Sequence, residues 1–114
     1  MVNCSLVESF KNALSGLAYA FLRERNIKLH LLAAIFVIFF ALRLDFSRME
    51  LIVLFFTIFL VFVAELFNTA VEAVVDLFTE EFHELARKAK NVAAGAVLLT
   101  CINALVIFYL LFIH

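Results

Sequence analysis

Five polar residues follow one another at helical spacing where the sequence is otherwise strongly apolar. Glu65 comes at the end of an almost unbroken apolar run, and four polar residues follow it: Asn68, Thr69, Glu72 and Asp76. At 100° per residue these side chains fall within an arc of roughly 100° on one helix face. An ionised carboxylate at membrane depth costs roughly 2.5–3.5 kcal/mol on insertion scales, so it persists where it faces a protein-lined or wet site. The pattern predicts a metal-assisted site inside or at the edge of a membrane.

Other charged residues are expected to join these acids at the same end of the helices, namely Glu24, His83, Arg87 and Lys90. Carboxylates gathered with a lysine suit Mg²⁺ and a polyphosphate, because hard oxygen ligands hold the ion and lysine neutralises phosphate charge. Glu65, the deepest acid, is suited to take a proton from a lipid hydroxyl as a general base. The sequence has neither G-x-x-x-x-G-K-[ST] nor G-x-G-x-x-G, so any nucleotide is bound without these loops.

The composition indicates a membrane protein. Of the 114 residues 67% are hydrophobic, 15 are phenylalanine, and the mean hydropathy is +1.11, whereas a soluble domain is usually nearer half apolar. Three runs are long enough to test against a bilayer: Ile27–Leu44, Leu51–Val75 and Val92–Ile113. A soluble helical protein with three such runs would have too little polar surface.

These elements predict an all-α membrane protein of one domain, residues 1–114. We expect an amphipathic helix over 5–22, lying in the membrane surface or packed on the bundle, and membrane helices over 27–44, 49–77 and 86–113. Residues 23–26 form a polar hinge; Ser47 caps the second membrane helix, and Thr79 or Glu80 the third. Most of the nine lysines and arginines precede the first span or separate the second from the third. The amino terminus is therefore expected in the cytoplasm and the carboxyl terminus outside.

The polar residues and their surroundings also match a known family. The matching blocks are Arg23–Asn26, Ala64–Asp76, His83–Ala86 and Ala89–Val97. With them, nearly the whole chain resembles the bacterial integral-membrane lipid kinases, which are the diacylglycerol kinases and the undecaprenol kinases. The E-R-N and A-A-G-A-V-L segments are more similar to the undecaprenol kinases of Gram-positive bacteria.

The resemblance implies a homotrimer in the bacterial cytoplasmic membrane, with each active site shared between neighbouring subunits. It implies transfer of the γ-phosphate of MgATP to the hydroxyl of undecaprenol or diacylglycerol. In this chain the catalytic residues would be Glu65, as the base, and Asn68, near the phosphates; Glu24 and Glu72 would hold Mg²⁺. Nucleotide contacts would fall on Glu81, Phe82, His83, Lys90 and Asn91. Position 91 departs from the family pattern A-K-D, because the chain has Ala89-Lys90-Asn91.

Other interpretations of these residues stay open at this stage. A small transporter or exporter could use a membrane glutamate such as Glu65 to bind a cation, and Asn91 is compatible with an inactive relative. Glu24 and Glu72 could be solvated anchors near the interface, and His83 a surface residue. Asp76, at a helix end, could pair with Arg87 or Lys88.

Overall fold

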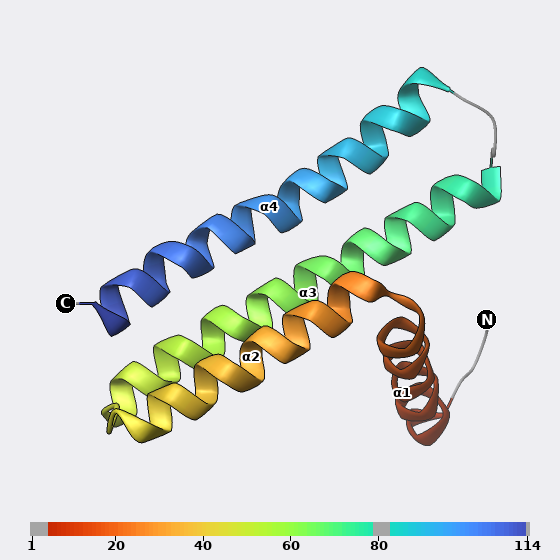
Figure 1. The fold of residues 1–114 in the computed structure, drawn as a ribbon. Coiled ribbons are helices and arrows are strands. Elements are labelled where there is room, and N and C mark those ends of the chain that lie inside the picture. Colours follow the sequence, from red (N-terminus) through yellow and green to blue (C-terminus); the bar gives the residue numbers. More distant parts are fainter. Residues whose placement is uncertain (1–4, 79–82, 114) are drawn as a thin grey trace.

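A computed structural model describes residues 5–78 and 83–113, and this part of the chain is helical apart from short connections. Figure 1 shows α1 (Leu6–Arg23), α2 (Arg25–Arg43), α3 (Arg48–Phe78) and α4 (Glu84–Phe112). The expected boundaries differ from these by one or two residues. The polar hinge is shorter than predicted: Glu24 alone breaks the helix, with an extended backbone at φ −94° and ψ 118°, and Arg25 already belongs to α2.

Polar side chains cap the amino-terminal ends of three of the helices. Ser5 Oγ accepts a hydrogen bond from the Glu8 amide at 3.1 Å. At the start of α3, Ser47 Oγ accepts from the Glu50 amide at 3.2 Å and Glu50 Oε1 accepts from the Ser47 amide at 2.8 Å, which together form a capping box. The predicted cap at Ser47 is therefore confirmed.

The cap of α4 is not one of the two residues expected from the sequence. His83 precedes the helix, and its Nδ1 accepts a hydrogen bond from the Leu85 amide at 3.2 Å. Thr79 and Glu80, the predicted caps, lie outside the described residues. The prediction was wrong because histidine is an unusual cap, and only the backbone geometry shows that its ring nitrogen reaches the helix.

The turn between α2 and α3 is tight. Asp45 has a φ of 55°, a left-handed conformation that aspartate tolerates better than most residues. The Phe46 amide donates back to the Ala41 carbonyl at 3.3 Å. The Phe46 ring then lies 4.8 Å from that of Phe112, centroid to centroid, which joins this turn to the far end of α4.

The three long helices have the length and composition of membrane spans. Each of α2, α3 and α4 is apolar enough to cross a bilayer, and large apolar side chains are exposed along all three. In water this surface would be strongly unfavourable, whereas in a bilayer it faces lipid. The chain therefore has three candidate membrane spans.

A seam of small and branched residues joins the spans. On α2 the buried residues are Ile27, Ala34 and Ala41, seven positions apart. On α3 they are Leu54, Thr57, Ile58, Val61, Glu65 and Asn68. Small residues let helices approach closely in a membrane, and here the alanines of α2 meet the branched side chains of α3. Three polar residues, Thr57, Glu65 and Asn68, therefore occupy positions in α3 where its helical repeat would place core residues.

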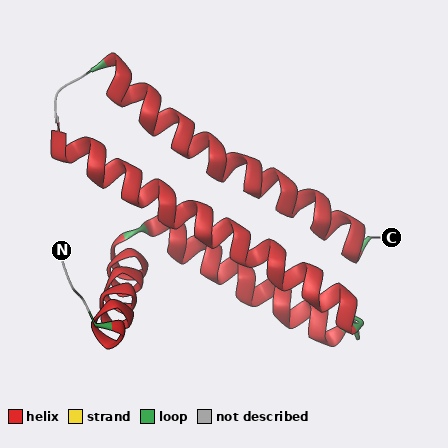
Figure 2. Ribbon diagram, turned by 180° about the vertical axis from the view of Figure 1, so that it is seen from behind, coloured by secondary structure: helices red, strands yellow, loops and turns green. Residues whose placement is uncertain are grey.

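Helix α1 lies at a steep angle to the other three, as Figure 2, viewed from behind, also shows. The Phe21 ring stacks on that of Phe62 in α3, with centroids 5.7 Å apart. Most of α1 is otherwise exposed. Its place in the membrane surface stays a prediction.

Candidate active site

Glu65 is the buried acid at the centre of the site. Its side chain is 2% exposed, because α3 turns it toward the seam with α2, in line with Ile58 and Val61. The structure thus confirms that this acid faces protein. A carboxylate buried this fully needs compensating polar contacts.

One such contact comes from His30 on α2. Its Nε2 lies 3.7 Å from Glu65 Oε2, and its ring meets the Phe62 ring edge-on, with centroids 6.4 Å apart. His30 was not among the residues predicted for the site. A signal was present, because His30 lies three residues after Ile27 and four before Ala34, on the face of α2 that packs against α3.

Asn68, one turn after Glu65, is also buried, with 9% exposure. Its Oδ1 is buried and has no hydrogen-bond partner within residues 5–78 and 83–113. An unsatisfied buried acceptor costs about 1–3 kcal/mol, so an oxygen left in this state is suited to accept a hydrogen bond from a bound molecule. Thr69 belongs to the predicted stripe, but its hydroxyl donates to the Glu65 carbonyl at 3.0 Å and so only supports the helix.

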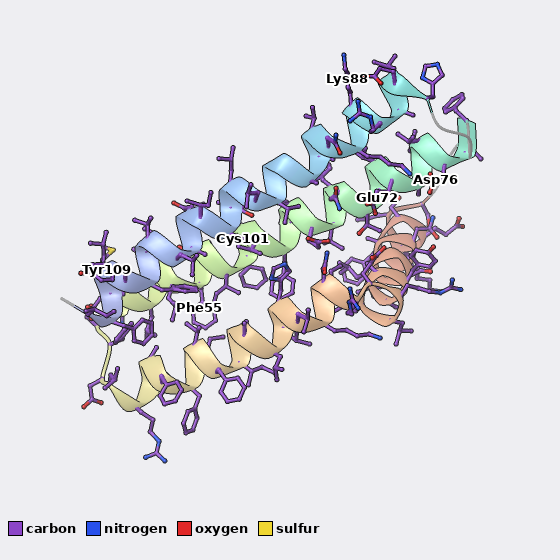
Figure 3. All side chains as sticks on the ribbon, turned by 45° about the horizontal axis from the view of Figure 1, so that its top comes forward. Phe55, Glu72, Asp76, Lys88, Cys101 and Tyr109 are labelled. Atoms are coloured by element: carbon purple, nitrogen blue, oxygen red, sulfur yellow. The ribbon has the colours of Figure 1, made fainter. Side chains whose placement is uncertain are left out.

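The predicted polar stripe runs from the protein interior to the surface. Glu65 and Asn68 are buried, Glu72 is half-buried and Asp76 is exposed. Figure 3 labels Glu72 and Asp76 on the part of α3 that lies near α1. The stripe therefore forms a polar path from the end of the helix to Glu65.

Charges from three parts of the fold act on Glu72. The groups that interact with it electrostatically are Glu24, Lys90, Glu65 and Asp76. Glu24 reaches the cluster because it stands at the break between α1 and α2, where its side chain makes no capping bond to the helix that follows. Lys90 is the basic member and comes from α4. The structure thus brings together the acids and the lysine that the sequence predicted.

Lys90 is fixed within the cluster by Asp76. Its Nζ donates to Asp76 Oδ1 at 2.7 Å. Pairing of Asp76 with Arg87 or Lys88 was the alternative left open; instead Asp76 pairs with Lys90, and Arg87 forms an ion pair with Glu84 at 2.9 Å. Antiparallel packing places Lys90 opposite Asp76, whereas Arg87 lies almost a full turn earlier.

The remaining residues predicted to contact nucleotide are less constrained. Asn91 is exposed beside Lys90. His83 is exposed at the start of α4, and its Nδ1 is occupied by the capping bond. Glu81 and Phe82 lie outside the described residues.

The acids suit a magnesium ion only in combination with other ligands. Within the described part of the chain, no three acidic, histidine or cysteine side chains are close enough to hold a metal ion together. Mg²⁺ usually binds through one or two carboxylates together with substrate phosphates. Glu24 and Glu72 interact electrostatically, and two such carboxylates fit this requirement.

An apolar pocket adjoins the buried end of the polar path. It has a volume of about 210 Å³ and lies between α2, α3 and α4. His30 and Phe62 line it on one side, and Cys101, labelled in Figure 3, lines it from α4. Glu65 therefore lies between charged groups toward one end of α3 and an apolar space toward the other. This arrangement can deprotonate a hydroxyl attached to an apolar molecule while a polyphosphate approaches from the charged side.

Comparison with known proteins shows the family of the chain. Residues 11–112 match the family model described as prokaryotic diacylglycerol kinase. A diacylglycerol kinase from Synechocystis sp. is 43% identical over 90% of this chain and 59% of its own length. An undecaprenol kinase from Bacillus subtilis is 39% identical over 89% of this chain and 85% of its own. A diacylglycerol kinase from Escherichia coli is 32% identical over 84% and 79%. The chain thus spans a little over half of the Synechocystis relative and most of the other two.

Proposed function

Because the chain belongs to the prokaryotic diacylglycerol kinase family, a family of lipid kinases, we propose that it transfers the γ-phosphate of MgATP to the hydroxyl group of a membrane lipid. The observation that carries the proposal is Glu65, an acid with 2% exposure at the inner end of a polar path. The charged cluster at the outer end of this path supplies groups suited to a polyphosphate. A transporter would not need a lysine and several acids gathered at one end of its helices.

In the proposed chemical step, Glu65 accepts the proton of the lipid hydroxyl. The lipid hydroxyl gives its proton to the Glu65 carboxylate while its oxygen forms a bond to the γ-phosphorus. The bond between that phosphorus and the β–γ bridging oxygen breaks, and ADP leaves. Such a step depends mainly on positioning and electrostatic stabilisation, and a base in hydrogen-bond reach of the hydroxyl contributes a further ~10²–10⁴-fold.

The other residues of the cluster bind and orient the nucleotide. Glu24 and Glu72 would hold Mg²⁺, which when bound offsets the charge of the phosphates. Lys90, held by Asp76 at 2.7 Å, is placed to attract phosphate oxygens from the same side. Asn68 Oδ1, a buried acceptor without a partner among the described residues, is suited to accept a hydrogen bond from a bound reactant near Glu65.

We also propose that the chain works as a homotrimer with shared sites. The described part of one chain supplies no complete set of metal ligands, so a neighbouring chain or the phosphates must complete the set.

The placement of basic residues supports an amino terminus in the cytoplasm, which puts the charged cluster on the side where ATP is found.

The lipid acceptor can be identified directly. Purified protein in detergent micelles is given radiolabelled ATP with diacylglycerol in one reaction and undecaprenol in a parallel one. We expect label in a lipid product that depends on Mg²⁺, in at least one of the two. If folded and oligomeric protein phosphorylates neither diacylglycerol nor undecaprenol, the proposed function is contradicted. If it phosphorylates at least one, the ratio of the two rates identifies the acceptor.

A further inference from the structure

The contact between His30 and Glu65 connects a residue without an assigned role to the proposed base. The two residues come from different helices, and their side chains meet within the seam that joins α2 to α3. The separation of 3.7 Å between His30 Nε2 and Glu65 Oε2 is longer than a hydrogen bond and short enough to become one through a small side-chain movement. Catalytic hydrogen bonds are often long in the absence of substrate and tighten in the reacting complex.

Within residues 5–78 and 83–113, His30 is the basic side chain that stands within ion-pair distance of Glu65. Lys90, the basic member of the charged cluster, is instead bound to Asp76 and acts on Glu72. The two basic side chains therefore have separate partners. His30 is close to the buried acid Glu65, and Lys90 interacts with the outer acids Asp76 and Glu72.

The His30 ring is itself held in place. It packs edge-on against Phe62, and α2 is anchored to the seam on either side of it by Ile27, which is fully buried, and Ala34. A glutamate side chain has three rotatable bonds, and fixing them requires a partner with a defined position. A ring that is restrained by its neighbours can provide that position.

We propose, as a consequence that rests on the proposed lipid kinase function, that His30 is a positioning residue for Glu65. Its Nε2–H donates to Glu65 Oε2, which fixes the carboxylate plane and leaves the other oxygen to accept the proton of the lipid hydroxyl. His30 touches neither phosphate nor metal in this arrangement, and it gains and loses no proton during the reaction. A misplacement of about 1 Å at a reacting group can lower a rate on the order of 10²-fold, which sets the size of the effect.

The test compares variants that remove the N–H with one that keeps a donor. His30→Leu should lower kcat by about 10–100-fold and leave KM for ATP and for the lipid within about twofold of the wild-type values, because binding does not use His30. His30→Gln, whose amide can donate to the same oxygen, should recover most of the lost kcat. Glu50→Gln, near the start of α3 and outside this pocket, is the control and should keep the wild-type kcat.

A double-mutant cycle separates positioning from a structural role. In the Glu65→Gln background the base is already absent, so His30→Leu should cause almost no further loss of the residual rate. Equal fold losses in both backgrounds would overturn the proposal, and so would a wild-type kcat in His30→Leu or a kcat in His30→Gln as low as that in His30→Leu.

Two controls keep the result unambiguous. If His30→Leu does not fold, His30→Phe replaces it, since a phenyl ring keeps the packing against Phe62 but has no N–H. If the wild-type protein phosphorylates neither lipid, the proposed function fails. An active wild-type protein whose kcat is insensitive to these substitutions contradicts the role of His30 alone.

Discussion

Substitution of Glu65 by glutamine tests the assignment of the base most directly. Glutamine has nearly the same size, so it fits a site where the side chain is 2% exposed, and its carbonyl oxygen can accept the hydrogen bond proposed from His30. The folded state should therefore be preserved. What the amide cannot do is accept the proton of the lipid hydroxyl.

The expected loss follows from the contribution of general base catalysis. A positioned base typically contributes ~10²–10⁴-fold, which corresponds to about 2.7–5.4 kcal/mol in the barrier at 1.36 kcal/mol per tenfold. We expect kcat for lipid phosphorylation to fall by at least ~10²-fold in Glu65→Gln. KM for ATP should change little, because the outer cluster proposed to bind the phosphates is intact.

The assay is the initial rate of labelled lipid formation at saturating ATP and lipid, with thermal denaturation in the same detergent as the measure of folding. Glu50→Gln is the matched control. It lies on the same helix far from the site, and glutamine serves in a capping box as glutamate does, so its kcat should equal that of the wild type. Turnover above a tenth of the wild-type rate in folded Glu65→Gln protein would refute the assignment of Glu65 as the base.

Three further predictions concern the outer cluster and the assembly. Glu24→Ala and Glu72→Ala should each raise the Mg²⁺ concentration needed for half-maximal activity, because fewer oxygen ligands remain; an unchanged Mg²⁺ titration in both would make these acids interface anchors. Mixing Glu24→Ala chains with Glu65→Gln chains should restore part of the activity if neighbouring chains share a site, and no recovery in demonstrably mixed oligomers would place each site within one chain. Asn91→Asp should lower KM for ATP without changing the lipid preference, because a charged acceptor makes a hydrogen bond roughly twice as strong as a neutral one. An unchanged or higher KM would show that position 91 is not a weakened nucleotide contact.

Local features of the fold could be predicted because they depend on residues close together in the sequence. The capping box of Ser47 and Glu50 and the three long apolar helices are of this kind. The shared helix face of Glu65 and Asn68 was predicted for the same reason. A helix of 3.6 residues per turn fixes which side chains share a face, and an acid in an apolar run must face protein or water.

Contacts between helices depended on the tertiary structure. The pairing of Asp76 with Lys90, rather than with Arg87 or Lys88, depends on how α4 is aligned beside α3, and a shift of one turn would exchange these partners. The contact of His30 with Glu65 depends in the same way on where α2 crosses α3. Helical periodicity fixes the direction of a side chain within its own helix and not the axial position of one helix against another, so the sequence did not show which residues of different helices lie at the same height. That position is set by how the alanines of α2 fit the branched side chains of α3, which is a property of the packed helices together.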